Sequence, residues 1–289
     1  MKLPTCSLAP ARRRRALMSL ATLAAAAADG ADTGRILCVV PSRWPPSRSL
    51  EAVASTWLKD CDSVTIAVSA RQFNASRGAT VARRKSARKF ITRSVAVTHD
   101  GAGFTPWLPI RAAVEYAAAR RGFDWLAMVE DDSVLHLKRL RAFLGRFSEN
   151  EPLTFGQCAC DRSPGMHFFS RAALAQIRPV VSTCAPGRYK AQSAGDVALL
   201  KCLDRANLTC TPAVDARGDA LISAMRSQRK PQMFRLLEAT RAGRRHCEEG
   251  KPSEPCTRGC WGGEAFGFHG KPLKNHFLVT HFYRALVGG

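Results

Sequence analysis

The sequence predicts an α/β fold in which a central sheet is flanked by helices. Short apolar segments suited to buried strands alternate along the chain with amphipathic segments suited to helices. Hydrophobic residues make up 46% of the 289 residues, enough to bury a full core as one large domain or two closely packed ones. The clearest strand candidate ends in three consecutive acids, and ligands of open α/β sheets bind just outside the carboxyl ends of strands.

The first elements form a strand, helix and strand pattern. Residues 36–40 are a compact apolar strand candidate, followed by a proline-rich turn at 41–46. Residues 50–57 then suit a helix, and residues 64–68 repeat the strand pattern. This order predicts a βαβ unit, and therefore a parallel pair of strands.

The alternation continues beyond a basic segment at 71–93, which we interpret as a loop. Residues 95–97 could add a short strand, and residues 106–120 suit a helix that leads into the acidic strand. Further expected elements are helices at 137–147 and 171–177, strands at 153–157 and 166–169, and a helix that begins at Asp196.

The C-terminal part has a different composition. Residues 241–274 are rich in glycine, cysteine and charge, which predicts a loop region tied by disulfides. We expect residues 277–283 to form a closing strand that contains His281. From the residues alone, His281 is either a hydrogen-bonded core histidine or a ligand.

The acidic motif follows the strand predicted at 125–129 and consists of Glu130, Asp131 and Asp132. Three neighbouring carboxylates repel one another, so holding them at the end of a rigid strand is costly unless a cation lies between them. This favours a divalent metal site that binds a phosphate ester. The alternative is a solvated acidic turn in which Asp131 or Asp132 caps the next helix.

The chain is strongly basic, with 44 lysines and arginines against 23 acids and a formal net charge of +21. Such a surplus favours anionic partners, although a solvated basic surface would also account for it. The sequence contains no zinc-finger spacing, no aromatic RNA-binding signature and no long basic amphipathic helix. Nucleic acid is therefore not an expected partner.

The N-terminal segment has the layout of a secretory signal. Four arginines at 12–15 precede an uncharged run at 16–28. This run is shorter than the about 17–25 apolar residues of a typical membrane span, so a cleaved signal peptide and a short membrane anchor both stay open. An organellar transit peptide is a third interpretation. We expect residues 1–31 to be the leader and residues 32–289 to form a single domain.

The cysteines and the sequons favour an oxidising lumen. Ten of the eleven cysteines lie beyond the leader, and an even number fits disulfides. Candidate N-glycosylation sites are Asn74 and Asn207. A zinc site is the competing interpretation, but the spacing of its candidate ligands lacks the paired knuckles of common structural zinc sites. Those candidates are His246, Cys247, Cys256 and Cys260.

The motifs occur in an order that resembles a known family. The segments that carry it are Ile36-Leu37-Cys38, Thr56-Trp57, Lys59 through Asp62, Trp107 with Ile110 and Ala112, Asp124 through Ser133, Phe155-Gly156, Ser170-Arg171 with Ala173-Leu174, Gly195 through Leu203, and Val279 through Tyr283. In their shared order these segments resemble the fringe-like β1,3-glycosyltransferases, and most closely the core 1 β1,3-galactosyltransferases.

The resemblance implies a GT-A fold with a mixed central sheet and the activity of an inverting, metal-dependent transferase. The enzyme would move a hexose, with galactose the first choice, from a UDP-sugar to a glycoprotein O-glycan. It would work in the Golgi lumen as a type II membrane protein or in a secreted form. The implied cofactor is Mn²⁺, which carboxylate oxygen and imidazole suit well.

The resemblance also assigns roles to individual residues. Asp132 and His281 would be the metal ligands, and Asp196 would be the catalytic base that takes a proton from the acceptor hydroxyl. Residues expected near the donor are Glu130, Asp131 and Trp107. Cysteines expected in disulfides are Cys38, Cys61, Cys184 and Cys202.

Three positions depart from the family pattern. Glu130 stands where the family has aspartate, and Gly195 replaces an acid beside the presumed base. Met166 is the last residue of the segment 163–166, which stands where the family has four residues rich in glycine, and this predicts a bulky side chain near the donor and acceptor pocket. These departures keep a second function open, that of a non-catalytic relative acting as a chaperone for a glycosyltransferase or as a glycan-binding protein.

Overall fold

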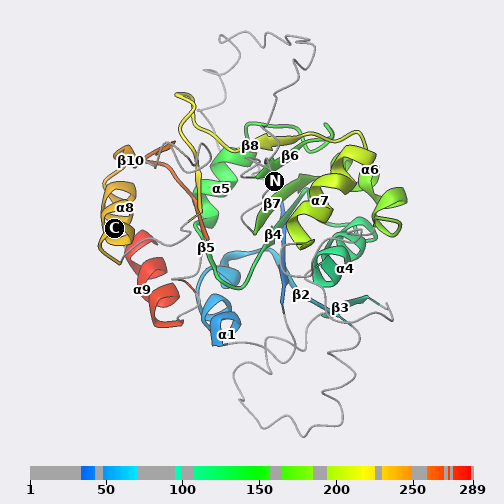
Figure 1. Ribbon diagram of the computed structural model, residues 1–289, viewed down its shortest axis with the longest axis horizontal. Coiled ribbons are helices and arrows are strands. Elements are labelled where there is room, and N and C mark those ends of the chain that lie inside the picture. The colour runs from blue at the N-terminus through cyan, green and yellow to red at the C-terminus, as the bar shows by residue number, and fades with distance from the viewer. Residues whose placement is uncertain are drawn as a thin grey trace, which may run out of the picture. The chain divides into compact units, whose positions relative to one another are not determined.

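A mixed seven-stranded sheet lies at the centre of the described part of the chain (Figure 1). The computed structural model describes residues 34–42, 48–69, 95–98, 107–156, 165–184, 194–224, 230–248, 259–269, 273 and 276–287. The leader, the basic segment at 71–93 and Asn74 lie outside these ranges. Residues Thr33–Gly289 form one compact unit.

The central sheet has the strand order β3-β2-β1-β4-β7-β6-β8. Its first four strands are parallel, β7 runs antiparallel to β4 and β6, and β8 is parallel to β6. The predicted parallel pair and the mixed sheet flanked by helices are therefore confirmed. The strands are β1 (Ile36–Pro41), β2 (Ser63–Ser69), β3 (Val95–Thr98), β4 (Trp125–Val129), β6 (Thr154–Gly156), β7 (Met166–Ser170) and β8 (Cys210–Pro212).

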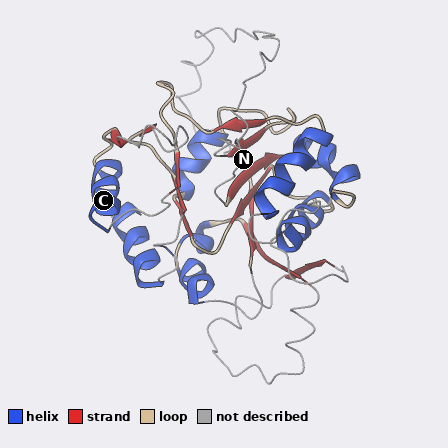
Figure 2. Ribbon diagram, viewed as in Figure 1, coloured by secondary structure: helices blue, strands red, loops and turns tan. Residues whose placement is uncertain are grey.

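Helices cover both faces of this sheet (Figure 2). Along β1, Leu37 and Val39 pack into a core with α4, α6 and α7, whereas Ile36 and Val40 pack into a core with α1, α5 and α9. Burial on both faces explains why these strands read as unbroken apolar runs. The helices are α1 (Arg48–Ser55), α4 (Trp107–Ala118), α5 (Leu137–Leu144), α6 (Arg171–Val181), α7 (Ala194–Arg205), α8 (Lys230–Arg241) and α9 (His276–Val287), with a short 3₁₀ helix η3 (Trp57–Asp60).

Two smaller sheets complete the described strands. One has the order β5-β12-β9, from β5 (Ser133–Leu135), β12 (Gly267–His269) and β9 (Ile222–Ala224). The other pairs β10 (His246–Glu248) with β11 (Gly259–Trp261). The expectation of a loop over 241–274 is therefore wrong in part, because three short strands lie within it.

The expected strand at 277–283 is also wrong, because these residues belong to helix α9. Val279, Phe282, Tyr283 and Leu286 are all buried, at a spacing of three and four residues that places them on one face of a helix. This apolar face packs into the core against α1 and β5. Tertiary burial thus outweighs the local preference of aromatic and β-branched residues for strands.

All four predicted disulfide cysteines form bonds. Cys38 of β1 is bonded to Cys61, which follows η3, and Cys184 after α6 is bonded to Cys202 of α7. The first bond fixes η3 to the central sheet. The second joins two neighbouring helices on the other face.

Candidate metal centre

Three chain segments meet at the carboxyl end of β4. The acidic motif, Glu130 to Asp132, follows β4 directly, and Ser42 follows the parallel neighbour β1. Because β7 runs antiparallel to β4, its first residues lie at the same edge, with Gly165 just before them. The Glu130 amide donates to the Gly165 carbonyl at 2.8 Å, which extends the β4–β7 ladder into the acidic turn.

A histidine reaches this edge from the β5-β12-β9 sheet. The chain turns at Asp131 and Asp132 and continues as β5, which pairs antiparallel with β12 so that Ser133 lies opposite His269. Arg139 of α5 donates to the carbonyls of Gly263 and Ala265, at 3.0 and 3.1 Å, and so anchors the segment before β12. This pairing brings a residue from the C-terminal part beside the acidic motif.

Glu130, Asp132 and His269 form the candidate metal centre. His269 Nε2 lies 2.9 Å from Asp132 Oδ1 and 3.2 Å from Glu130 Oε2. One ligand atom from each residue falls within 4.8 Å of the other two. Asp132 is buried, whereas Glu130 and His269 are partly exposed, so the group lies at the boundary between the core and the surface. Two carboxylates and one imidazole are a donor set that suits Mn²⁺ and similar divalent ions.

The electrostatics of the group depend on its histidine. Burial on its own would lower the pKa of His269, but its contacts with the Asp132 and Glu130 carboxylates outweigh burial and raise the pKa to about 10. Without an ion, the imidazolium therefore supplies the positive charge that two adjacent carboxylates require. A divalent cation would replace that charge and take up the neutral imidazole as a ligand.

Gly165 leaves room for the side chains of Glu130 and His269. Its φ is +65°, and a Cβ built on it would lie 2.8 Å from both Glu130 Oε2 and His269 Nε2. Any other residue would push its side chain against two of the candidate ligand atoms. The ligand set, the buried carboxylate and this glycine cradle together fit a bound metal ion.

Asp131 points to another partner. Its Oδ2 accepts a hydrogen bond from the Ser42 hydroxyl at 3.0 Å, so the middle acid is oriented from the end of β1. The expected alternative, in which Asp131 or Asp132 caps the next helix, is wrong. Strand β5 lies between the acids and α5, and His136 caps α5 by accepting a hydrogen bond from the Arg139 amide.

The other expected site residues lie in different surroundings. His281 is exposed on α9 and is not part of the Glu130–Asp132–His269 group. Trp107 is 2% exposed and packs in the apolar core beneath α4, an environment that favours a structural role. Asp196 lies in the first turn of α7, which begins at Ala194 rather than at Asp196. Asn207 is exposed on a turn after α7, with a φ of +53°.

Met166 is fully buried, in the core with Phe266 and Phe268 of the β12 segment. Its side chain is therefore part of the core, and its expected position near a donor and acceptor pocket stays a prediction. Its sulfur would lie 2.8 Å from a Cβ built on Gly267, so the two positions are complementary in size.

His269 was missed from the sequence because its segment was interpreted as a loop. The available signal was the apolar run at 266–268 immediately before a histidine, which is also the pattern of a short buried strand. Comparison with protein-family models and with curated proteins gave no match to this chain. Among the described residues, no helix is both long and apolar enough to cross a bilayer.

Proposed function

We propose that this protein is a divalent-cation-dependent glycosyltransferase that uses a nucleotide-diphosphate sugar. The observation that carries the proposal is the Glu130–Asp132–His269 group at the carboxyl end of β4. In α/β sheets this end of the strands is where nucleotide ligands bind. The order of sequence motifs resembles that of the fringe-like β1,3-glycosyltransferases, and it supports the same function through segments other than the acidic motif as well.

Glu130, Asp132 and His269 would hold the ion, with Mn²⁺ the expected metal. When bound there, Mn²⁺ would neutralise the negative charge of the donor diphosphate as the sugar leaves. In this proposal His269 takes the ligand role that the family resemblance implies for His281. Glu130, which the resemblance places near the donor, would act as a ligand itself.

The chain's other residues would orient the substrates. Ser42 orients the Asp131 carboxylate at the same edge, where Asp131 would lie near the donor ribose. Asp196, in the first turn of α7, stays the predicted base for the acceptor hydroxyl. The proposed reaction transfers a hexose, galactose first, from a UDP-sugar to a glycoprotein O-glycan with inversion.

The proposed location is the lumen of the secretory pathway, in the Golgi. Two disulfides among the described residues support an oxidising compartment. Attachment to the membrane through the N-terminal segment, as a type II protein, is part of this proposal.

The test measures Mn²⁺ binding and UDP release from a panel of UDP-sugars by wild type and by Asp132→Ala. We expect Mn²⁺ to bind wild type, and one donor to be hydrolysed or transferred in a reaction that EDTA and the substitution abolish. Tight Mn²⁺ binding without turnover of any donor or acceptor would indicate the chaperone-like or glycan-binding function. Absence of Mn²⁺ binding by folded protein would contradict the cation site, and the three side chains would then form an ion triad only.

A further inference from the structure

Trp57 makes a buried hydrogen bond to the backbone beside the candidate metal centre. Its indole Nε1 donates to the Ser133 carbonyl at 3.0 Å, and Trp57 and Ser133 are both fully buried. Ser133 is therefore next to Asp132 in the chain and next to His269 across the β5–β12 strand pair.

The register of β5 and β12 explains why this carbonyl needs an outside donor. The His136 amide donates to the Phe266 carbonyl at 2.8 Å, which makes that position a hydrogen-bonded pair. Hydrogen-bonded and non-hydrogen-bonded pairs alternate along an antiparallel ladder, so the Ser133–His269 pair is of the second kind. The Ser133 carbonyl thus faces away from β12, at the edge of the small sheet. There it accepts the hydrogen bond from the Trp57 indole N–H.

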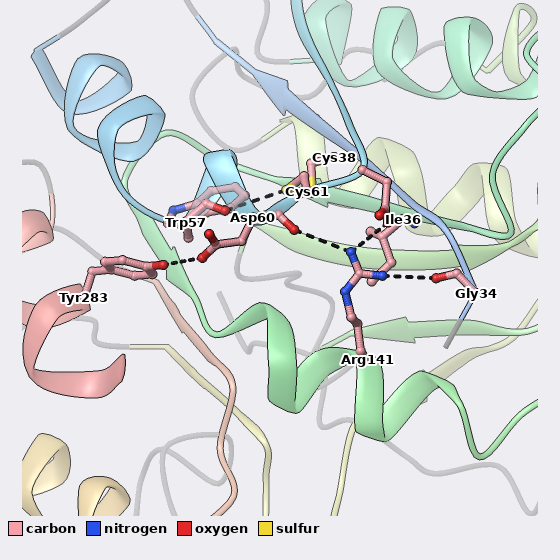
Figure 3. The surroundings of a disulfide bond; sticks show 9 residues. Gly34, Ile36, Cys38, Trp57, Asp60, Cys61, Arg141 and Tyr283 are labelled. Carbon is pink, nitrogen blue, oxygen red and sulfur yellow. Dashed lines mark hydrogen bonds and ion pairs between the residues drawn. A yellow bond between two sulfur atoms is a disulfide. The ribbon is translucent and has the colours of Figure 1, made fainter. Parts of the chain in front are cut away.

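Trp57 is itself held by a rigid platform, shown in Figure 3. The Cys38–Cys61 disulfide fixes the end of η3 to β1. The Tyr283 hydroxyl of α9 donates to the Asp60 carboxylate of η3. From α5, Arg141 donates to the Asp62 carboxylate at 2.7 Å, and the same carboxylate oxygen accepts the Ile36 amide of β1 at 2.7 Å.

We propose that Trp57 is a positioning residue for the metal centre, which sets the place of Asp132 and His269 by holding the carbonyl of Ser133. This inference rests on the cation site of the proposed function. Because the Trp57 indole is bonded to the main chain of Ser133, it would act on the ion through the backbone. Loss of its N–H would leave a buried carbonyl without that donor and let the β5 edge shift.

The test is Mn²⁺ titration of the purified protein without donor, followed by the electron paramagnetic resonance signal of free Mn²⁺. Trp57→Phe removes the N–H and keeps an aromatic ring, and we expect its affinity for Mn²⁺ to fall by about tenfold, as for other residues that orient metal ligands. A second variant carries 3-benzothienylalanine at position 57, in which sulfur replaces the N–H at nearly constant volume. It should lose affinity to a similar extent while its thermal unfolding stays close to that of wild type.

The matched control is Trp125→Phe. Trp125 is 3% exposed in the same apolar core as Trp57 but starts β4, at the end of the strand away from the acids. This variant should lose stability without losing Mn²⁺ affinity. Wild-type affinity in both Trp57 variants would overturn the positioning role and leave the proposed function standing. Failure of wild type to bind Mn²⁺ would overturn both.

Discussion

Gly165 and Glu130 are joined by a backbone hydrogen bond, and the Glu130 carboxylate occupies space that a side chain at position 165 would need. The Glu130 amide donates to the Gly165 carbonyl, and a Cβ on Gly165 would come within 2.8 Å of Glu130 Oε2. The same hypothetical Cβ would lie equally close to His269 Nε2. The need for glycine here therefore has two causes, a positive φ and the ligand atoms themselves.

These two causes can be separated by substitution. Gly165→Ala should weaken Mn²⁺ binding by at least about tenfold, because the new methyl group displaces two ligands, and should cost about 1–2 kcal/mol in stability for the left-handed backbone. Gly243 is the matched control, since its φ is +64° and a Cβ there meets nothing within 4 Å. Gly243→Ala should lose similar stability in urea unfolding but bind Mn²⁺ as wild type does. Equal Mn²⁺ affinity in the two variants would contradict the placement of the site beside Gly165.

The two histidines offer a direct comparison between the sequence-based and the structure-based ligand sets. His269 lies 2.9 Å from Asp132, whereas His281 is exposed on α9 and outside the group. We expect His269→Ala to abolish Mn²⁺ binding and His281→Ala to leave it unchanged, as measured by isothermal titration calorimetry. The reverse result would restore His281 as the ligand and require a different arrangement of α9.

The strands of the central sheet were predictable because their apolar sequences match their burial on both faces of the sheet. Along β4, Trp125, Ala127 and Val129 face one core and Leu126 and Met128 the other, so the whole run is apolar. The acids that end this run mark the sheet edge in the sequence itself. The fold class and the two carboxylates of the candidate metal centre therefore follow from local pattern.

The histidine side of the centre was not predictable in this way. His269 reaches Asp132 only because β12 pairs with β5, and the register of such distant strands depends on packing across the whole domain. The aromatic and β-branched residues at 277–283 favoured a strand, although Val279, Phe282, Tyr283 and Leu286 already had helical spacing. That spacing by itself predicts a helix that contains His281.

The two disulfides should differ in their effect on the metal centre but not in their effect on stability. Cys38 and Cys61 are separated by 23 residues and Cys184 and Cys202 by 18, so the loop-entropy model gives each bond about 3 kcal/mol. We expect the double variants Cys38→Ala/Cys61→Ala and Cys184→Ala/Cys202→Ala to lose comparable stability in urea. Only the first bond fixes η3, so only the first variant should also lose Mn²⁺ affinity. Equal Mn²⁺ affinity in both variants would show that η3 keeps its place without the bond.

His167 should make the fold sensitive to acid. This histidine of β7 is 1% exposed, and neither ring nitrogen has a hydrogen-bond partner among the residues that the structure describes. Burial lowers its pKa from the usual 6.5 to about 3. Because the unfolded chain then binds a proton more readily than the folded protein, stability from this group is full above pH 6.5 and falls as the pH decreases toward 3. At pH 5.5 the loss is about 1.4 kcal/mol.

Urea unfolding of wild type and His167→Leu at pH 7.5 and pH 5.5 measures this contribution. Other titrating groups, His269 among them, are present in both proteins, so their effects cancel in the comparison. We expect wild type to lose about 1.4 kcal/mol more than the variant between the two pH values, since leucine has no proton to bind. Identical losses would mean that the His167 ring accepts a proton inside the folded protein, through a partner that its buried position in β7 does not show.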